Sequence, residues 1–144
     1  MTASVYSYKL NLKVYNYKPW REASMNNLKL CESDYRFMLV VWENEPVASG
    51  QLVTLCSEKL GWKKPTTYTV LRKMCEKGLL KNEDTIVSSI VPKGQVQAYE
   101  SEHFIERTFE GSLPQFLVSF FGNKPLSKKE AEELKRLIDE HEER

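Results

Sequence analysis

Apolar residues recur at helical spacing in two consecutive segments of the chain, one on either side of Pro46. In each segment they fall three or four positions apart, which predicts two amphipathic helices. The first helix is expected to end before Pro46, and the second to begin near Ala48 or Ser49 and to stop at Gly61. The two apolar stripes consist of Tyr35, Met38, Val41 and Trp42 in the first helix and of Leu52, Leu55, Cys56 and Leu60 in the second.

A third helix and a small hairpin are predicted downstream. Pro65 lies where a first helical turn accepts proline, so this helix is expected to begin there and to run to Lys77, just before Gly78. Helix, glycine-containing turn and helix form the helix-turn-helix signature. Two β-prone runs, residues 79–81 and 85–91, flank a polar turn and predict a hairpin. The expected fold class is therefore mostly α with a small β-hairpin (α+β), a winged helix-turn-helix followed by a helical segment.

The third predicted helix has a packing side and a free side. The free side carries short hydroxyl groups near its start and long cations farther along, which suits base-edge and phosphate contacts in a major groove. A solvated helix face explains this one helix equally well. At about 100° per residue, the packing side consists of Val70, Leu71, Met74 and Cys75, and the predicted DNA-binding residues are Lys63, Lys64, Thr66, Tyr68, Thr69, Arg72 and Lys73.

Charge is distributed unevenly although the net charge is only +1. Residues 61–81 carry six cations and the single anion Glu76, a net +5, whereas residues 82–144 carry eight cations and thirteen anions, a net −5. One concentrated basic segment in a nearly neutral chain whose remainder is acidic indicates a local anion-binding surface.

Length and composition favour a soluble globular protein of one domain or two small ones. The chain has 144 residues, of which 41% are hydrophobic and 28% charged. No apolar run approaches the roughly 20 residues of a membrane span, and the N-terminal stretch lacks the apolar core of a secretory signal. A cytoplasmic protein is expected.

Candidate catalytic chemistry is sparse. The chain has two histidines, His103 and His141, and no Gly-rich phosphate loop, nucleophile elbow or metal-spaced carboxylate cluster. Cys31, Cys56 and Cys75 are scattered, and we interpret them as small core residues in a reducing compartment. The sequence predicts neither an enzyme nor a bound metal or cofactor.

The C-terminal part is too apolar for a short helix pair to hide by itself. Its last predicted helix begins with a capping box of Ser127 and Glu130 and adds another apolar stripe. A second chain is expected to cover these side chains, and folding back onto the winged domain is the alternative. The predicted dimerisation residues are Phe109, Leu113, Phe116, Leu117, Phe120, Phe121, Leu134, Leu137 and Ile138.

Several spaced blocks match one known family together. They are Met38 and Trp42, the pair Pro46-Val47, the pattern Trp62-x-x-x-Thr66-x-x-Thr69-x-Leu71-x-Lys73-Met74-x-x-Lys77-Gly78, and EHFIERTFEGSLPQFLVSFFGNKPLSKKEAEELKRLIDE. Over about residues 28–140 the chain resembles the penicillinase repressors, whose relatives include methicillin-resistance and copper-responsive repressors. The chain departs from the pattern in Lys63-Lys64-Pro65, where many members have Ser-Pro, and in Tyr68, where some have arginine. These departures bear on the operator sequence more than on the fold.

The resemblance implies a homodimeric transcriptional repressor that binds a dyad operator in double-stranded DNA. It also implies release by a membrane sensor-protease in a β-lactam-type antibiotic response, through cleavage before a phenylalanine that here corresponds to the His103–Phe104 bond. Release by a small-molecule ligand and a winged-helix protein-interaction module are the alternatives. The C-terminal Cys-x-Cys pairs of copper-responsive members are absent from this sequence, so that branch is not expected.

Three regions are predicted along the chain. Residues 1–27 form an N-terminal extension, residues 28–91 a winged-helix DNA-binding domain, and residues 92–144 a helical dimerisation domain. The extension alternates apolar with polar residues from Tyr6 to Val14, a strand-like pattern that could pair with a sheet edge. Its interleaved Tyr and Lys residues also suit contact with nucleic acid, and an upstream translation start is a further explanation.

Overall fold

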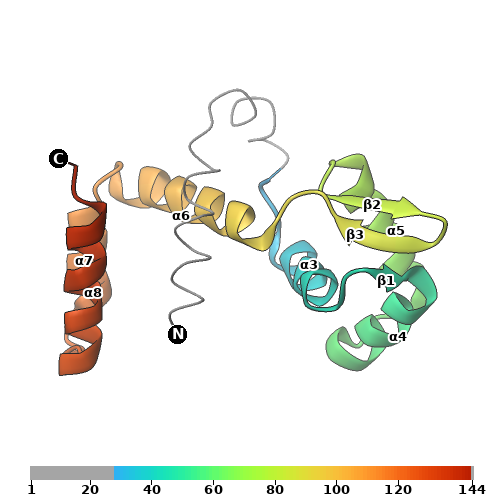
Figure 1. Cartoon of the computed structure of the whole chain (residues 1–144), viewed down its shortest axis with the longest axis horizontal. Helices are drawn as coiled ribbons and strands as arrows, with labels where there is room; N and C mark the ends of the chain where they lie inside the picture. The colour runs from blue at the N-terminus through green and yellow to red at the C-terminus, as the bar shows by residue number, and fades with distance from the viewer. Residues whose placement is uncertain (1–27, 144) are drawn as a thin grey trace. The chain divides into compact units, whose positions relative to one another are not determined.

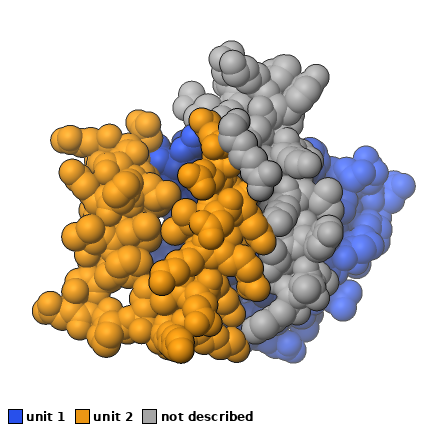
Figure 2. Space-filling view, turned by 60° about the vertical axis from the view of Figure 1, so that its left-hand side comes forward, with its two compact units in different colours: residues 1–103 blue, residues 104–144 orange. Residues whose placement is uncertain are grey.

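The computed structural model describes residues 28–143. The strand-like pattern predicted between Tyr6 and Val14 lies outside the described residues. Contacts divide the chain into two compact units, one ending at His103 and the other beginning at Phe104 (Figure 2). Each unit is described below by itself.

Three helices build most of the first unit: α3 (Glu32–Asn44), α4 (Ser49–Leu60) and α5 (Lys64–Glu76) (Figure 1). The three predicted helices are thus confirmed. Gly61 ends α4 in the left-handed region, with φ of 70°, and Pro65 lies in the first turn of α5. The short connection between α4 and α5 gives the helix-turn-helix its geometry.

The core of this unit lies where α3, α4 and α5 meet. Met38 and Val41 of α3, Leu52 and Cys56 of α4, and Leu71 and Met74 of α5 are buried together. Phe37, which the predicted stripe of α3 does not include, is also fully buried, and its ring stacks on Trp62 with 5.8 Å between centroids. Since Trp62 precedes α5, this contact holds the start of α5 against α3.

A three-stranded antiparallel sheet completes the winged helix, with the order β1-β3-β2. Its strands are β1 (Val47–Ala48), β2 (Leu80–Glu83) and β3 (Ile86–Ser89). The predicted hairpin is confirmed, but β2 extends through Glu83, so the turn is only Asp84-Thr85, where both residues have positive φ. Positive φ at both loop residues matches the right-handed twist of the strands in a two-residue hairpin. β1 was not predicted.

Gly61 offers a direct test of how α4 ends. Because its φ of 70° disfavours a side chain, Gly61→Ala should lower the free energy of unfolding by about 1 kcal/mol. Gly50 is the matched control, because it lies inside α4 and a Cβ added there would meet no atom within 4 Å beyond its chain neighbours and the helix backbone. Gly50→Ala should leave stability equal or higher. Urea unfolding of both variants checks this, and equal losses would contradict it.

The helix α6 (Lys93–Phe109) contributes to both units. Its first turns belong to the winged core, since Val96 is fully buried there and Trp42 donates its indole N–H to the Val91 carbonyl at 3.1 Å. The predicted domain division after Val91 falls before this helix. We propose that the winged-helix domain extends to His103.

The second unit also contains α7 (Leu113–Phe121) and α8 (Lys128–His141). Ser112 and Ser127 cap them, each accepting a hydrogen bond from the backbone N–H three residues later. The predicted Ser127 cap is therefore present. Neither helix has a fully buried residue. Within residues 28–143, no helix has the length and apolar character needed to cross a membrane.

Candidate nucleic-acid interface

The helix α5 is held with one side in the core and the other in solvent. Leu71 and Met74 are buried, while Val70 and Cys75 are half-buried beside them. This agrees with the predicted packing side. Thr67 is also fully buried, although the packing stripe predicted from the sequence does not include it.

The predicted DNA-binding residues all belong to α5 or to the turn that leads into it. Tyr68 is half-buried against the core, and the others are exposed, namely Lys63, Lys64, Thr66, Thr69, Arg72 and Lys73. Thr69 donates its hydroxyl hydrogen to the Pro65 carbonyl at 2.9 Å, so its oxygen is left to accept from a partner. Lys64 places its ammonium 6.0 Å from the centre of the Tyr68 ring, a cation–π contact.

The start of α5 is electrically positive. Its N-cap, Lys63, makes no side-chain capping bond, and the first turn contains no acidic residue. Uncapped N–H groups and the helix dipole favour an anion at such an end, and Lys63 and Lys64 add their charges. The arrangement can hold a phosphate group.

Lys73 has a partner that periodicity does not reveal. Its Nζ lies 2.8 Å from Oδ2 of Asp34, a residue of the first turn of α3 that is only 3% exposed. The hydrogen bond to Asp34, with its charge, raises the pKa of Lys73, so the ammonium stays protonated at neutral pH. The predicted phosphate contact of Lys73 thus competes with an ion pair inside the protein.

Among the other cations of the basic segment, two have a hydrogen-bond or ion-pair partner and three have no described acidic partner. Lys81 pairs with Glu83 at 3.8 Å, and Lys77 donates to the Lys29 carbonyl at 3.3 Å. Lys63, Lys64 and Arg72 have no acidic partner among the described residues. On the free side of α5 and in the turn before it, these three supply positive charge that no described acidic residue neutralises.

The second unit carries the exposed apolar surface. Phe104, Phe109, Phe116, Phe120 and Phe121 form a chain of ring contacts with centroids 5.5–6.3 Å apart. None of the predicted dimerisation residues is fully buried within the described chain. Leu113, Phe120 and Ile138 are exposed, and Phe109, Phe116, Leu117, Phe121, Leu134 and Leu137 are half-buried.

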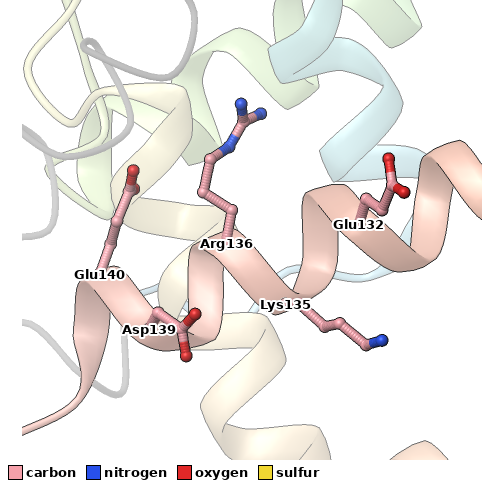
Figure 3. Close-up of a pocket in the computed structure, with 5 residues that line it drawn as sticks. All are labelled: Glu132, Lys135, Arg136, Asp139 and Glu140. Carbon is pink, nitrogen blue, oxygen red and sulfur yellow. The ribbon is translucent and has the colours of Figure 1, made fainter.

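The side of α8 that faces away from its predicted dimerisation residues is polar. Figure 3 shows a shallow pocket lined by Glu132, Lys135, Arg136, Asp139 and Glu140, all from this one helix. At helical spacing these residues lie opposite Leu134, Leu137 and Ile138. A row of mixed charges on one helix is typical of a solvated face, so the amphipathic α8 has its apolar stripe on the other side.

The predicted cleavage bond lies inside α6, at the junction of the two units. The His103 ring stacks on Tyr99 one turn earlier, with 5.7 Å between centroids. Phe104 is 39% exposed and meets Phe109 and Phe116 edge-on.

The cysteines do not form a metal site. Among the described residues, no group of three or more histidine, cysteine or acidic side chains could hold a metal ion. Burial raises the pKa of Cys56 and of Cys75, which suppresses their thiolate forms. Cys31 is exposed at the N-cap of α3, so its interpretation as a core residue is wrong.

Comparison with known proteins matches most of the chain to one family. The profile of the family described as "Penicillinase repressor" matches residues 30–140, which extends over both compact units. The chain is 22% identical over 120 residues to the penicillinase repressor of Bacillus licheniformis, covering 81% of this chain and 94% of that protein. It is 19% identical over 115 residues to the methicillin resistance regulatory protein MecI of Staphylococcus aureus strain N315, covering 77% and 94%. The same values apply to MecI of Mammaliicoccus sciuri.

Proposed function

The chain belongs to the penicillinase repressor family, and from this premise we propose that it is a transcriptional repressor that binds a dyad operator in double-stranded DNA as a homodimer. The membership confirms the resemblance drawn from the sequence blocks. The relatives are named as a repressor and as regulatory proteins, in agreement with the expectation that this chain is not an enzyme.

One observation carries the DNA-binding proposal. The free side of α5 presents hydroxyl groups together with Lys63, Lys64 and Arg72, which no described acidic residue neutralises. In helix-turn-helix proteins the second helix of the motif enters the major groove. We assign base-edge or nearby phosphate contacts to Thr66, Tyr68 and Thr69, and phosphate contacts to the three cations.

The exposed apolar surface of the second unit supports the homodimer. Phe120 is 66% and Ile138 61% exposed, and exposed apolar surface of this kind marks association sites. In a two-fold dimer each protomer would read one half-site of the operator.

We further propose that repression ends by cleavage of the His103–Phe104 bond by a membrane sensor-protease. The bond joins the two compact units. A cut there would leave α5 intact and remove the proposed dimerisation residues from the DNA-binding unit. Affinity for the operator would then fall, because the two DNA-binding units would no longer be linked.

Arg72→Ala tests the assigned surface. Replacing a phosphate-contacting cation should reduce the slope of log affinity against log salt by about one per protomer. Fluorescence anisotropy with the protein's own promoter region and with a random duplex, at several salt concentrations, measures this. Arg136→Ala is the matched control, because it removes the same charge from the polar side of α8.

Two results would contradict the proposal. Equal affinity of the wild-type protein for its promoter region and for the random duplex would reject operator binding. An unchanged slope for Arg72→Ala, or an equal decrease for Arg136→Ala, would place the interface away from the free side of α5.

A further inference from the structure

The ion pair between Lys73 and Asp34 joins a solvent-facing cation to a buried anion. The Lys73 side chain is 49% exposed, whereas that of Asp34 is 4% exposed, and their charged atoms are 2.8 Å apart. The pair connects the free side of α5 with the first turn of α3. Lys73 therefore lies beside the proposed DNA contacts on the free side of α5, while Asp34 already neutralises its charge.

Moving the ammonium of Lys73 to a DNA phosphate would leave the Asp34 carboxylate buried without its cation. No second cation among the described residues forms an ion pair with Asp34. Leaving a buried charge unpaired is strongly unfavourable, whereas an exposed cation–phosphate contact in water contributes modestly. Lys73 is thus expected to stay with Asp34 when DNA is present.

We propose that Asp34 is a specificity-determining residue that withholds Lys73 from the DNA phosphates. This inference rests on the proposed DNA binding and concerns its selectivity. Phosphate contacts raise affinity for every sequence alike, because they release counterions whatever the bases are. Removing one cation from phosphate binding lowers non-specific affinity, so the hydroxyl groups of Thr66 and Thr69 account for a larger share of the discrimination.

Neutral replacements of Asp34 and Lys73 test whether Lys73 is held by Asp34 or contacts a DNA phosphate. Asp34→Asn retains the shape of the side chain and frees Lys73, while Lys73→Met retains most of the stem and removes the charge. The double variant lacks both charges. Arg72→Met, at a neighbouring exposed cation with no described acidic partner, is the control for a true phosphate contact.

The experiment measures salt dependence of binding for these four variants and the wild type, with the promoter fragment and with a random duplex of equal length. Asp34→Asn should steepen the slope by about one per protomer, which raises affinity for random DNA several-fold near 0.1 M salt and reduces the preference for the promoter. The double variant should return to the wild-type slope, and Lys73→Met should leave the slope unchanged. Arg72→Met should decrease it by about one.

A decrease of about one in the slope for Lys73→Met, equal to that of Arg72→Met, would overturn the inference, as would an unchanged slope for Asp34→Asn. Circular dichroism shows which variants fold. If either single variant fails to fold, the uncharged double variant decides, because a wild-type slope supports the inference and a smaller slope refutes it. Promoter preference of the wild-type protein reports separately on the proposed function, so the two failures are distinguishable.

Discussion

Replacing Phe120 by aspartate should convert the protein from a dimer into a monomer and weaken its binding to the promoter region by about 10²- to 10⁴-fold. Phe120 is 66% exposed, and its ring contacts those of Phe116 and Phe121 in α7. If a second copy covers this ring, a carboxylate there would be buried without a partner, which association cannot tolerate. The loss in affinity follows because a single winged unit reads one half-site alone.

Val118 supplies the matched control for Phe120. It belongs to the same helix and is 73% exposed, but at about 100° per residue it lies away from the stripe of Leu113, Leu117 and Phe120. Val118→Asp should therefore leave the dimer intact. Analytical ultracentrifugation and anisotropy compare the two variants. A dimeric Phe120→Asp protein, or dissociation by Val118→Asp alone, would place the interface on another surface.

Truncation after His103 makes the same test without a charged substitution. The residues removed belong to the second unit, and the buried Val96 stays with the winged core. The shortened chain should fold, sediment as a monomer and bind the promoter region as weakly as Phe120→Asp.

The helical part of the winged fold was predictable because local signals agree there. Each of the three helices buries an apolar stripe, and Pro46, Gly61 and Gly78 mark their limits. β1 gave no such signal, since two residues cannot show a period. Its identity as a strand depends on the pairing of Val47 with Val87, forty positions away.

The division of the chain between His103 and Phe104 could not be predicted from the sequence, for a different reason. The helix α6 continues without a break from the buried Val96 of the winged core to Phe104 and Phe109 of the aromatic chain. No glycine or proline interrupts it between Gly94 and Gly111. Where one regular helix serves two units, the boundary depends on tertiary contacts that the local sequence does not mark.

The sequence predicts which side of α5 is exposed, but it does not show which of the cations on that side are paired within the protein. Helical periodicity places Thr69, Arg72 and Lys73 on the free side of α5, and the structure leaves them exposed there. The partner of Lys73 is 39 positions earlier, in the first turn of another helix. Net charge along the sequence therefore overestimates the charge that this surface can offer to DNA.

Co-expression with the proposed membrane sensor-protease, followed by a β-lactam, should yield a fragment that begins at Phe104. A bond inside a helix must become extended before a protease can hold it, so the His103–Phe104 bond requires α6 to open locally. Opening there breaks the stacking of His103 on Tyr99 and the ring contacts of Phe104, but leaves the winged core in place. Repression of a reporter should end as the intact chain disappears.

Phe104→Ala should block this cleavage and keep the reporter repressed after induction, because it removes the side chain that follows the bond. Phe109→Ala is the matched control, since Phe109 belongs to α6 and to the same aromatic chain but lies five residues after Phe104. That variant should still be cut before Phe104. Mass spectrometry identifies the fragments. Derepression with the wild-type chain intact would reject proteolytic release, and a first residue other than Phe104 would reject the assigned bond.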